Sequence, residues 1–183
     1  IGGEEAGAGN TIAYSGSDGV LVDGGNGNSL RQNSIFASGN LGIELVNNGN
    51  HNQEFPVITS AVSADGMITI EGALVSAPMT TYTIEFFVNS VCNPSGFGEG
   101  ETFLGSAMVT TDGAGNAGFS ITFDGAVDPG RFITATATDP GGNTSQFSQC
   151  AEVTGPNSPG WPGFPPNWMD GLLWAYQKDS QRK

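Results

Sequence analysis

Cysteine and histidine limit the chemistry of this chain, because it has only two cysteines and one histidine. Cys92 and Cys150 form no CxxC motif, and His51 stands alone in an asparagine-rich stretch. No Cys/His cluster has zinc spacing, and no GxSxG-like sequence supplies a serine nucleophile. In a chain rich in glycine and threonine and poor in lysine, we expect a Cys92–Cys150 disulfide, with two buried free thiols as the alternative.

Two glycine-rich loops carry oxygen ligands four positions apart. Asp112 and Asn116 bracket the first loop, and Asp139 and Asn143 bracket the second. Calcium prefers oxygen ligands, but neither loop has the ligand number or the terminal Glu of an EF-hand. Both sequences are equally typical of hairpin turns. Calcium at these four residues is therefore a hypothesis, and no other cofactor is expected.

The charge balance excludes one class of partner. Five Lys+Arg against 18 Asp+Glu give a formal net charge of −13, and such a field repels nucleic-acid phosphates. No stretch is long and apolar enough for a membrane span, and the sequence starts at Ile1 and contains no signal peptide. We expect a piece of a longer exported precursor, located extracellularly or in the periplasm and associated with the cell surface.

Aromatic and basic residues concentrate at the C-terminus, from residue 155 to 183. Five prolines between 155 and 166 predict an extended segment, and the spacing after it predicts a short helix. Such a tail is typical of a docking arm, in which aromatic anchors insert into a partner and the basic end meets an acidic surface. Contact with a membrane and packing on its own chain are the alternatives. The candidate partner-binding residues are Trp161, Phe164, Trp168, Leu172, Trp174, Tyr176, Lys178, Arg182 and Lys183.

The first fifty residues contain an internal repeat with a period of 23 positions (33 − 10, 42 − 19, 45 − 22). Asn10-Thr-Ile recurs as Asn33-Ser-Ile, and Gly19-Val recurs as Gly42-Ile. A period of this length, with short apolar steps between Gly/Asn corners, predicts coils of a parallel β-helix over residues 1–50. The expected inward side chains are Ile12, Val20, Val22, Ile35, Ile43 and Leu45. Two coils leave the Ile1 end to be covered by upstream coils or by a partner chain.

From residue 51 to 154 the hydrophobic period changes to two. Seven alternating runs separated by turn sequences predict a seven-stranded antiparallel sandwich of immunoglobulin-like or fibronectin-like type. The fold class is therefore all-β, with terminal coils, a sandwich and a Pro/Trp-rich tail. The expected strands are 57–63, 67–74, 82–88, 103–111, 119–123, 131–138 and 147–153.

Several of these segments resemble a known architecture. Gly39-Asn-Leu-Gly-Ile-Glu-Leu45 is similar to the right-handed β-helix repeats of large secreted bacterial proteins. Tyr82-Thr-Ile-Glu-Phe-Phe87 and the run from Phe132 to Ser145 resemble the immunoglobulin-like sandwich that often closes those helices. The resemblance covers about residues 1–153 and implies a surface or adhesin-like protein. The tail resembles no family.

Because many β-helix proteins process polysaccharides, an enzyme is one hypothesis. Lyase chemistry needs a base together with carboxylates, and the coil segment offers Asp18, Asp23, Glu44 and Arg31. The two aspartates stand at turn positions, where Asp makes local hydrogen bonds. We therefore predict no catalytic residue and no enzymatic activity.

The sequence favours a non-catalytic extracellular module that is a subunit or fragment of a larger surface assembly, docked through its tail. A carbohydrate-binding module with exposed rings such as Tyr14, Phe97 or Trp161 is the first alternative. The non-catalytic end of a polysaccharide-processing β-helix enzyme is the second. Expected partners are a protein or upstream β-helix coils, with a glycan as the alternative, and no nucleic acid.

Overall fold

A computed structural model describes residues 1–5 and 7–155 of the chain. Within these residues the fold is all-β, with one short 3-10 turn, η1 (Gly49–Asn52). The strands before this turn are β1 (Thr11–Ala13), β2 (Val20–Asp23), β3 (Ser34–Phe36) and β4 (Ile43–Val46). The strands after it are β5 (Val57–Ala64), β6 (Met67–Val75), β7 (Thr81–Asn89), β8 (Thr102–Thr110), β9 (Asn116–Asp124), β10 (Phe132–Thr138) and β11 (Ala151–Glu152).

The four short strands form two parallel pairs in the register that the internal repeat predicted. In the β1–β3 pair Ile12 lies beside Ile35, and in the β2–β4 pair Val20 lies beside Ile43. Both pairs join residues 23 positions apart (35 − 12, 43 − 20). An isolated parallel bridge between Gly2 and Arg31 adds a third pairing. The N-terminal segment thus makes two turns, one stacked on the other, which we call the two-turn stack (residues 1–52).

Polar side chains join the two turns at their corners. The side-chain amide of Asn10 donates to Oδ1 of Asn33 at 3.1 Å, and that of Asn47 donates to Oδ1 of Asp23 at 2.6 Å. The corner after β4 has left-handed backbone at Asn47, Asn48, Asn50, His51 and Asn52. Asparagine adopts this conformation more readily than most residues, so its frequency in the repeat has a local structural reason.

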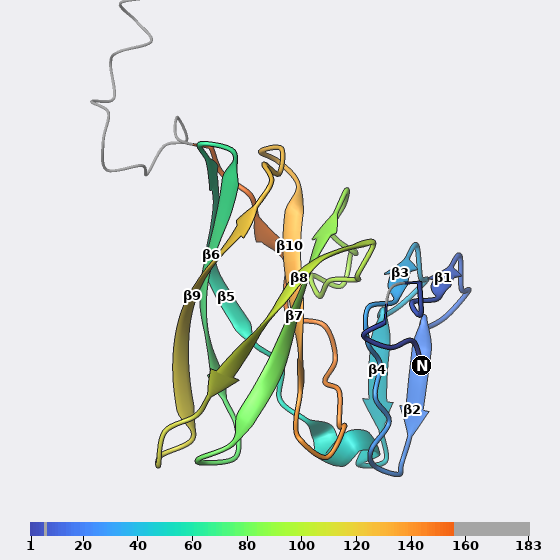
Figure 1. Ribbon diagram of the computed structural model, residues 1–183. Helices are drawn as coiled ribbons and strands as arrows, with labels where there is room; N and C mark the ends of the chain where they lie inside the picture. The colour runs from blue at the N-terminus through green and yellow to red at the C-terminus, as the bar shows by residue number, and fades with distance from the viewer. Residues whose placement is uncertain (6, 156–183) are drawn as a thin grey trace, which may run out of the picture.

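The seven strands from β5 to β11 form two antiparallel sheets that pack face to face (Figure 1). One sheet has the order β5-β6-β9, and the other has the order β11-β10-β7-β8. Alternate side chains of β6, β7 and β10 fill the space between them, and Phe86 contacts Phe119 and Phe123 edge-on at 5.8 and 5.5 Å. The period of two therefore predicted the strands, although β7 and β10 are buried on both faces.

One predicted strand is much shorter than expected. Residues 147–153 were predicted as a strand, but β11 includes only Ala151 and Glu152. Upstream of β11, the hydroxyl groups of Ser145 and Ser148 accept hydrogen bonds from Ala137 N–H and Ala135 N–H. These hydroxyls take the place of strand carbonyls, so the segment runs beside β10 without a regular ladder.

The predicted tail falls almost wholly on residues 156–183, which lie outside the described residues. Its extended segment, its short helix and its aromatic anchors therefore stay predictions. The predicted domain boundary at residue 50 also stays a prediction. In space the two-turn stack and the sandwich share a hydrophobic core, in which Ile35 and Ile43 of the stack pack with Phe87 of the sandwich.

Candidate interaction surface

Three phenylalanines of the sandwich cover one end of the two-turn stack. The ring centroid of Phe87 lies 5.8 Å from that of Phe103 and 5.3 Å from that of Phe147, and both contacts are edge-on. These rings belong to the same buried cluster as Ile35 and Ile43 of the second turn. The outer face of the four-stranded sheet is therefore not a solvated face. It is the cap on the interior of the stack.

Backbone pairing makes the same junction. Ile35 and Gly100 exchange two hydrogen bonds, of 2.7 and 2.8 Å, so the loop before β8 closes the free edge of β3. A side chain at position 100 would not fit, because its Cβ would lie 2.7 Å from Phe147 and 3.0 Å from Phe87. Gly100 is thus required for the close approach of the sandwich to the stack.

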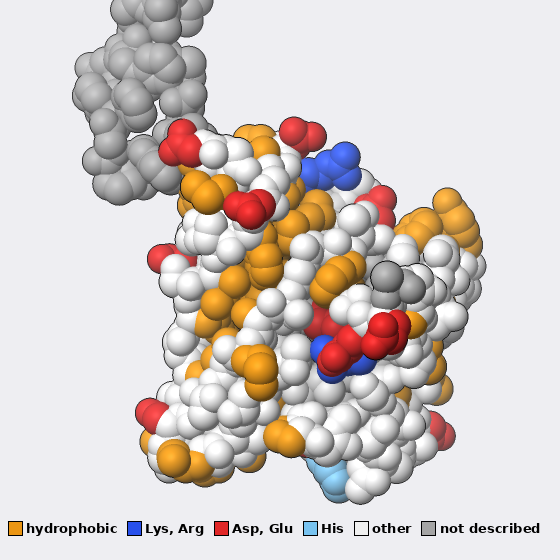
Figure 2. Space-filling model, viewed as in Figure 1, with side chains coloured by type: hydrophobic (Ala, Val, Ile, Leu, Met, Phe, Trp, Pro, Cys, Tyr) orange, Lys and Arg blue, Asp and Glu red, His pale blue; other side chains and the backbone are white. Residues whose placement is uncertain are grey.

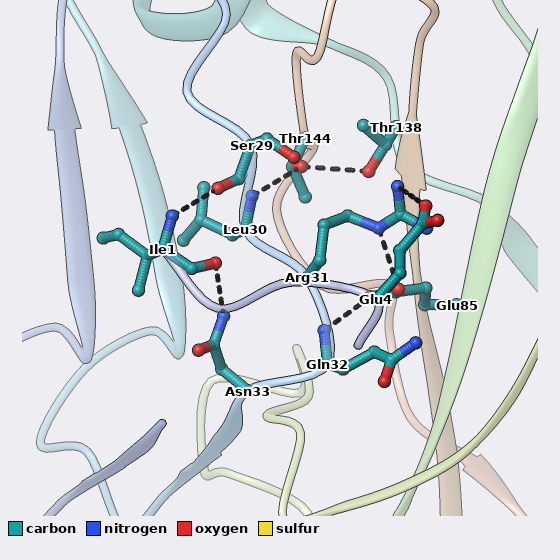
Figure 3. A network of polar contacts seen from close by, with 10 residues as sticks. All are labelled: Ile1, Glu4, Ser29, Leu30, Arg31, Gln32, Asn33, Glu85, Thr138 and Thr144. Atoms are coloured by element: carbon teal, nitrogen blue, oxygen red, sulfur yellow. Dashed lines mark hydrogen bonds and ion pairs between the residues drawn. The ribbon is translucent and has the colours of Figure 1, made fainter. Parts of the chain in front are cut away.

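A buried carboxylate holds the second turn of the stack against β7 (Figure 3). The Glu85 side chain has no exposed surface; Oε1 accepts from Arg31 Nε at 2.8 Å and Oε2 accepts from Gln32 N–H at 3.0 Å. Arg31 also contacts Glu4, whose side chain is exposed. Because an unpaired buried charge is costly, Glu85 ties the folding of the sandwich to the presence of the stack.

A second buried carboxylate acts in the same way from the loop between β7 and β8. The two oxygens of Glu99 accept hydrogen bonds from Ala37 N–H and Ser38 N–H at 3.1 and 2.8 Å. In the same loop, the Asn93 amide donates to the carbonyls of Ser38 and Asn40. The long loop is therefore shaped to fit the corner of the stack.

The loop after β10 completes the junction on the other side. Asn143 Oδ1 accepts from Gly27 N–H at 2.6 Å, and Thr144 Oγ1 accepts from Leu30 N–H at 3.0 Å. The fully buried Asn50 amide donates to the carbonyls of Asn28 and Thr144. This corner is thus hydrogen-bonded to both turns and to the sandwich at once.

The opposite end of the two-turn stack has no such cover. In Figure 1, β1 and β2 lie on the side away from the sandwich, and each pairs with one strand only. Ile1 and Leu21 expose 60% and 54% of their surface there. A hollow of about 440 Å³ opens between Ile1, β2 and the turn at residues 24–30. We call this end of the stack the open edge.

The predicted disulfide is present. Cys92 and Cys150 are bonded, with 6.1 Å between their Cα atoms, and no free cysteine remains among the described residues. The bond joins the loop that carries Glu99 to the segment before β11. It therefore fixes the loop that fits the corner of the stack.

The four predicted calcium ligands lie in two separate hydrogen-bonded turns. Asp112 Oδ1 accepts from Ala114 N–H and Asn116 N–H, and these bonds hold the pKa of its carboxyl below the usual range. Asp139 accepts from Asn143 N–H and from the Asn143 amide. The described ranges contain no group of three His, Cys, Asp or Glu side chains that could hold a metal ion. Both loops are used as turns, and calcium binding stays a hypothesis.

The carboxylates considered for enzyme chemistry take part in the stack itself. Asp18 accepts from Leu41 N–H and from Ser17; these bonds lower its pKa although partial burial acts in the opposite direction. Burial and the adjacent Asp18 raise the pKa of Glu44. His51 is exposed and lies 3.0 Å from the Asn26 amide. Hydrogen bonds within the stack therefore hold Asp18, and the absence of enzymatic activity stays a prediction.

The two described rings of the glycan hypothesis differ in exposure. Tyr14 exposes 81% of its surface and touches Phe36 edge-on. Phe97 is half-buried and packs against Phe55 at 5.5 Å. Only Tyr14 of this pair presents an open ring, and Trp161 lies outside the described residues.

Sequence reasoning missed Glu85 and Glu99, the two buried acids of the junction. The alternation in β7 places Glu85 on the outer face of the sheet, away from the core of the sandwich. A glutamate on such a face ordinarily meets water. No sequence signal shows that the stack covers this face.

No described helix is long and apolar enough to cross a membrane.

Comparison with known proteins assigns no family to this chain. No protein-family model matches it, and no curated protein matches it. Among solved structures, a chain described as "Biofilm associated protein - BSP domain" is similar with a TM-score of 0.40 and 22% identity. The match covers 61% of this chain and 16% of that chain. A likeness at this level carries no functional argument.

Proposed function

We propose that the chain is a non-catalytic structural and interaction module at the end of a larger extracellular surface assembly. In this proposal the two-turn stack is the end of a parallel β-helix, and an immunoglobulin-like sandwich closes it. Residues 155–183 serve as a docking arm. The seven strands in sheets of three and four support the sandwich type.

One observation carries the proposal: the two ends of the stack differ. At one end the β3 edge pairs with Gly100, and Phe87, Phe103 and Phe147 cover the interior. At the other end β1 and β2 keep free edges beside an open hollow. Unpaired strand edges are templates for further pairing. The sandwich thus suits a terminal cap, and the open edge suits the side on which the assembly continues.

The disulfide supports a location outside the cytoplasm. Disulfides persist in oxidising compartments and are rare where thioredoxin and glutathione keep thiols reduced. Here the Cys92–Cys150 bond holds the loop that contacts the stack. A cell-surface location fits this chemistry.

The open edge can be tested with an extended chain. We would place a second copy of residues 1–28 before Ile1, which supplies a third turn in the same register. We expect the amides of β1 and β2 to gain protection from hydrogen exchange, because their free edge becomes paired. A matched extension whose copied Val20 and Val22 are replaced by Asp should give no protection. Equal exchange rates with and without the intact extension would refute the proposal for this edge.

The docking arm needs a separate experiment. Light scattering of the native material, with and without residues 156–183, measures the mass of the assembly. Loss of a large assembly on truncation supports the docking arm. A monomer in both cases, with a mass of 18.8 kDa for the full chain, would reject it without affecting the argument for the open edge.

Glycan binding is a second candidate, favoured by the exposure of Tyr14 alone. Aromatic rings that face solvent can stack on sugars. Screening the chain and its Tyr14→Ala variant against a glycan array tests this candidate. Binding that the substitution does not weaken would exclude Tyr14 as the platform.

A further inference from the structure

The edge strand β8 is a second unpaired edge, separate from the open edge and from the tail. It pairs with β7 only and ends the four-stranded sheet. Its nine residues, Thr102–Thr110, include neither a charged residue nor a proline, in a chain with 18 acidic side chains. Charged residues and proline are the usual means by which proteins block a sheet edge. In β8 both are missing.

The backbone groups that face outward on β8 can be assigned. Thr111 N–H donates to Thr80 O on the β7 side. Successive residues of an antiparallel strand point their N–H groups to opposite sides. With Val109 opposite Tyr82 and Ala107 opposite Ile84 in unbroken register, the N–H groups of Ser106 and Met108 point away from β7. These donors are available to an added strand.

The other edges of the sandwich are shorter, paired or charged. β11, at the far end of the same sheet, has two residues. β5 is bridged at Val62 by Thr154. β9 is as long as β8, with nine residues, but it carries a charge, Asp124, at its end. Among the described strands of the sandwich, β8 therefore combines a long edge with no charged residue and no proline. Beyond its bulge between Phe103 and Gly105, residues 105–110 pair with β7 in regular register.

On the face of the sheet that points away from the sandwich core, the side chains of β8 are uncharged and exposed. Met108 exposes 76% of its surface, and Ser106 and Thr110 are also exposed. Hydrophobic and uncharged side chains cover the part of the front face that β8 crosses in Figure 2. An uncharged, exposed ribbon of this kind accommodates the side chains of a neighbouring strand.

Charge decides which strand fits. Residues 1–155 contain 16 acidic side chains and two arginines, Arg31 and Arg131, a formal balance of −14 (2 − 16). In an antiparallel pair of two copies, Glu101 of each copy would approach the Asp112 end of the other. Two such copies repel, whereas a cationic segment is attracted over its whole approach.

We infer that β8 is an interaction surface that accepts an extended, cationic segment of another protein as a fifth strand of the sheet. Backbone hydrogen bonds from Ser106 and Met108 supply the affinity, and the acidic surroundings select the charge of the partner. This surface lies on the sandwich, so it remains available whether or not the stack continues at its open edge.

The probe is a capped peptide, Lys-Thr-Val-Thr-Val-Thr-Lys, compared with the same peptide carrying Glu at both ends. We expect the cationic peptide to shift the NMR signals of the β8 amides, with binding that weakens at high salt. The Glu-ended peptide should not bind. Shifts confined to residues outside β8, or equal binding of both peptides, would overturn the inference.

Substitutions at Met108 supply the matched controls. Met108→Pro removes an outward donor, and proline is tolerated on the solvent side of an edge strand, whereas Met108→Ala keeps the donor. We expect the proline variant to bind about tenfold more weakly than the alanine variant. Met108→Lys should weaken binding and Met108→Glu should not. Equal affinity of the proline and alanine variants would refute strand addition.

Two other occupants are distinguished by the same material. A dimer in light scattering that Met108→Pro abolishes would show that a second copy occupies β8. Tighter peptide binding by a chain that ends at Gly155 would show that the tail of the same chain competes for this edge. Either result replaces the partner inferred here.

Discussion

The contact between Arg31 and Glu85 provides the sharpest test of the junction. Glu85 lies on β7 with no exposed surface, and Arg31 reaches it from the second turn of the stack at 2.8 Å. Replacing Arg31 by Met keeps most of the apolar stem and removes the charge. Oε1 of Glu85 then loses the hydrogen bond from Arg31, and only the bond from Gln32 N–H to Oε2 remains.

The expected cost follows from the burial of the carboxylate. Removing one partner of a buried ion pair destabilises a protein by about 3–5 kcal/mol, because the other charge is left unpaired. The exposed contact between Arg31 and Glu4 adds little, since exposed ion pairs contribute about 0–1 kcal/mol. For a chain of this size, the melting temperature should fall by roughly 6–20 °C.

Urea unfolding monitored by circular dichroism measures this change. The matched control is Arg131→Met, because Arg131 is exposed and its loss should change the free energy of unfolding by less than about 0.5 kcal/mol. In a double variant, Glu85→Met should recover most of the loss caused by Arg31→Met, because no buried charge remains. Equal effects of Arg31→Met and Arg131→Met would refute a buried latch between stack and sandwich.

Three further predictions test other parts of the fold. Replacing both Cys92 and Cys150 by Ser should lower the free energy of unfolding by about 4 kcal/mol, the value of the chain-entropy model for a separation of 58 residues. Urea unfolding of the variant and of the oxidised parent measures this change. An unchanged urea midpoint would contradict the prediction. Gly98→Ala should destabilise by about 1–3 kcal/mol because its Cβ would lie 1.9 Å from Thr134 Cγ2, whereas Gly118→Ala, with nothing within 4 Å, is the control. The lowered pKa of Asp112 means that its charged form stabilises the fold above its unfolded pKa, and that this contribution is lost as pH falls through the folded pKa. Asp112→Asn should therefore be less stable than the parent at neutral pH and should converge with it in acid; a constant difference in melting temperature across this range would show that the carboxylate charge is not the cause.

The spacing of residues in the sequence predicted the local pairings well. The 23-residue repeat predicted the register of β1 with β3 and of β2 with β4, because apolar side chains must stack on one another inside such turns. The alternation of apolar residues predicted the long strands and the side chains that pack between the two sheets. Turn residues also predicted the hairpin at Asp65 and Gly66, both of which adopt positive φ.

The sequence could not show what covers the outer face of the four-stranded sheet. Thr134, Thr136 and Glu85 alternate with the core residues of β10 and β7, and this pattern ordinarily marks a solvated face. All three are buried. Their burial depends on the position of the stack, and the contacts between Arg31 and Glu85 and between Gly27 and Asn143 join residues far apart in sequence.

For this protein, the sequence alone determined the all-β class, the repeat register, the acidic field and the pair of cysteines. Periodicity, composition and charge are local or summed properties, so they can be read without coordinates. Only the tertiary structure decided which end of the stack is capped, that two buried glutamates join stack to sandwich, and that β8 keeps a free edge. These features depend on which surfaces meet, and no local pattern encodes that contact.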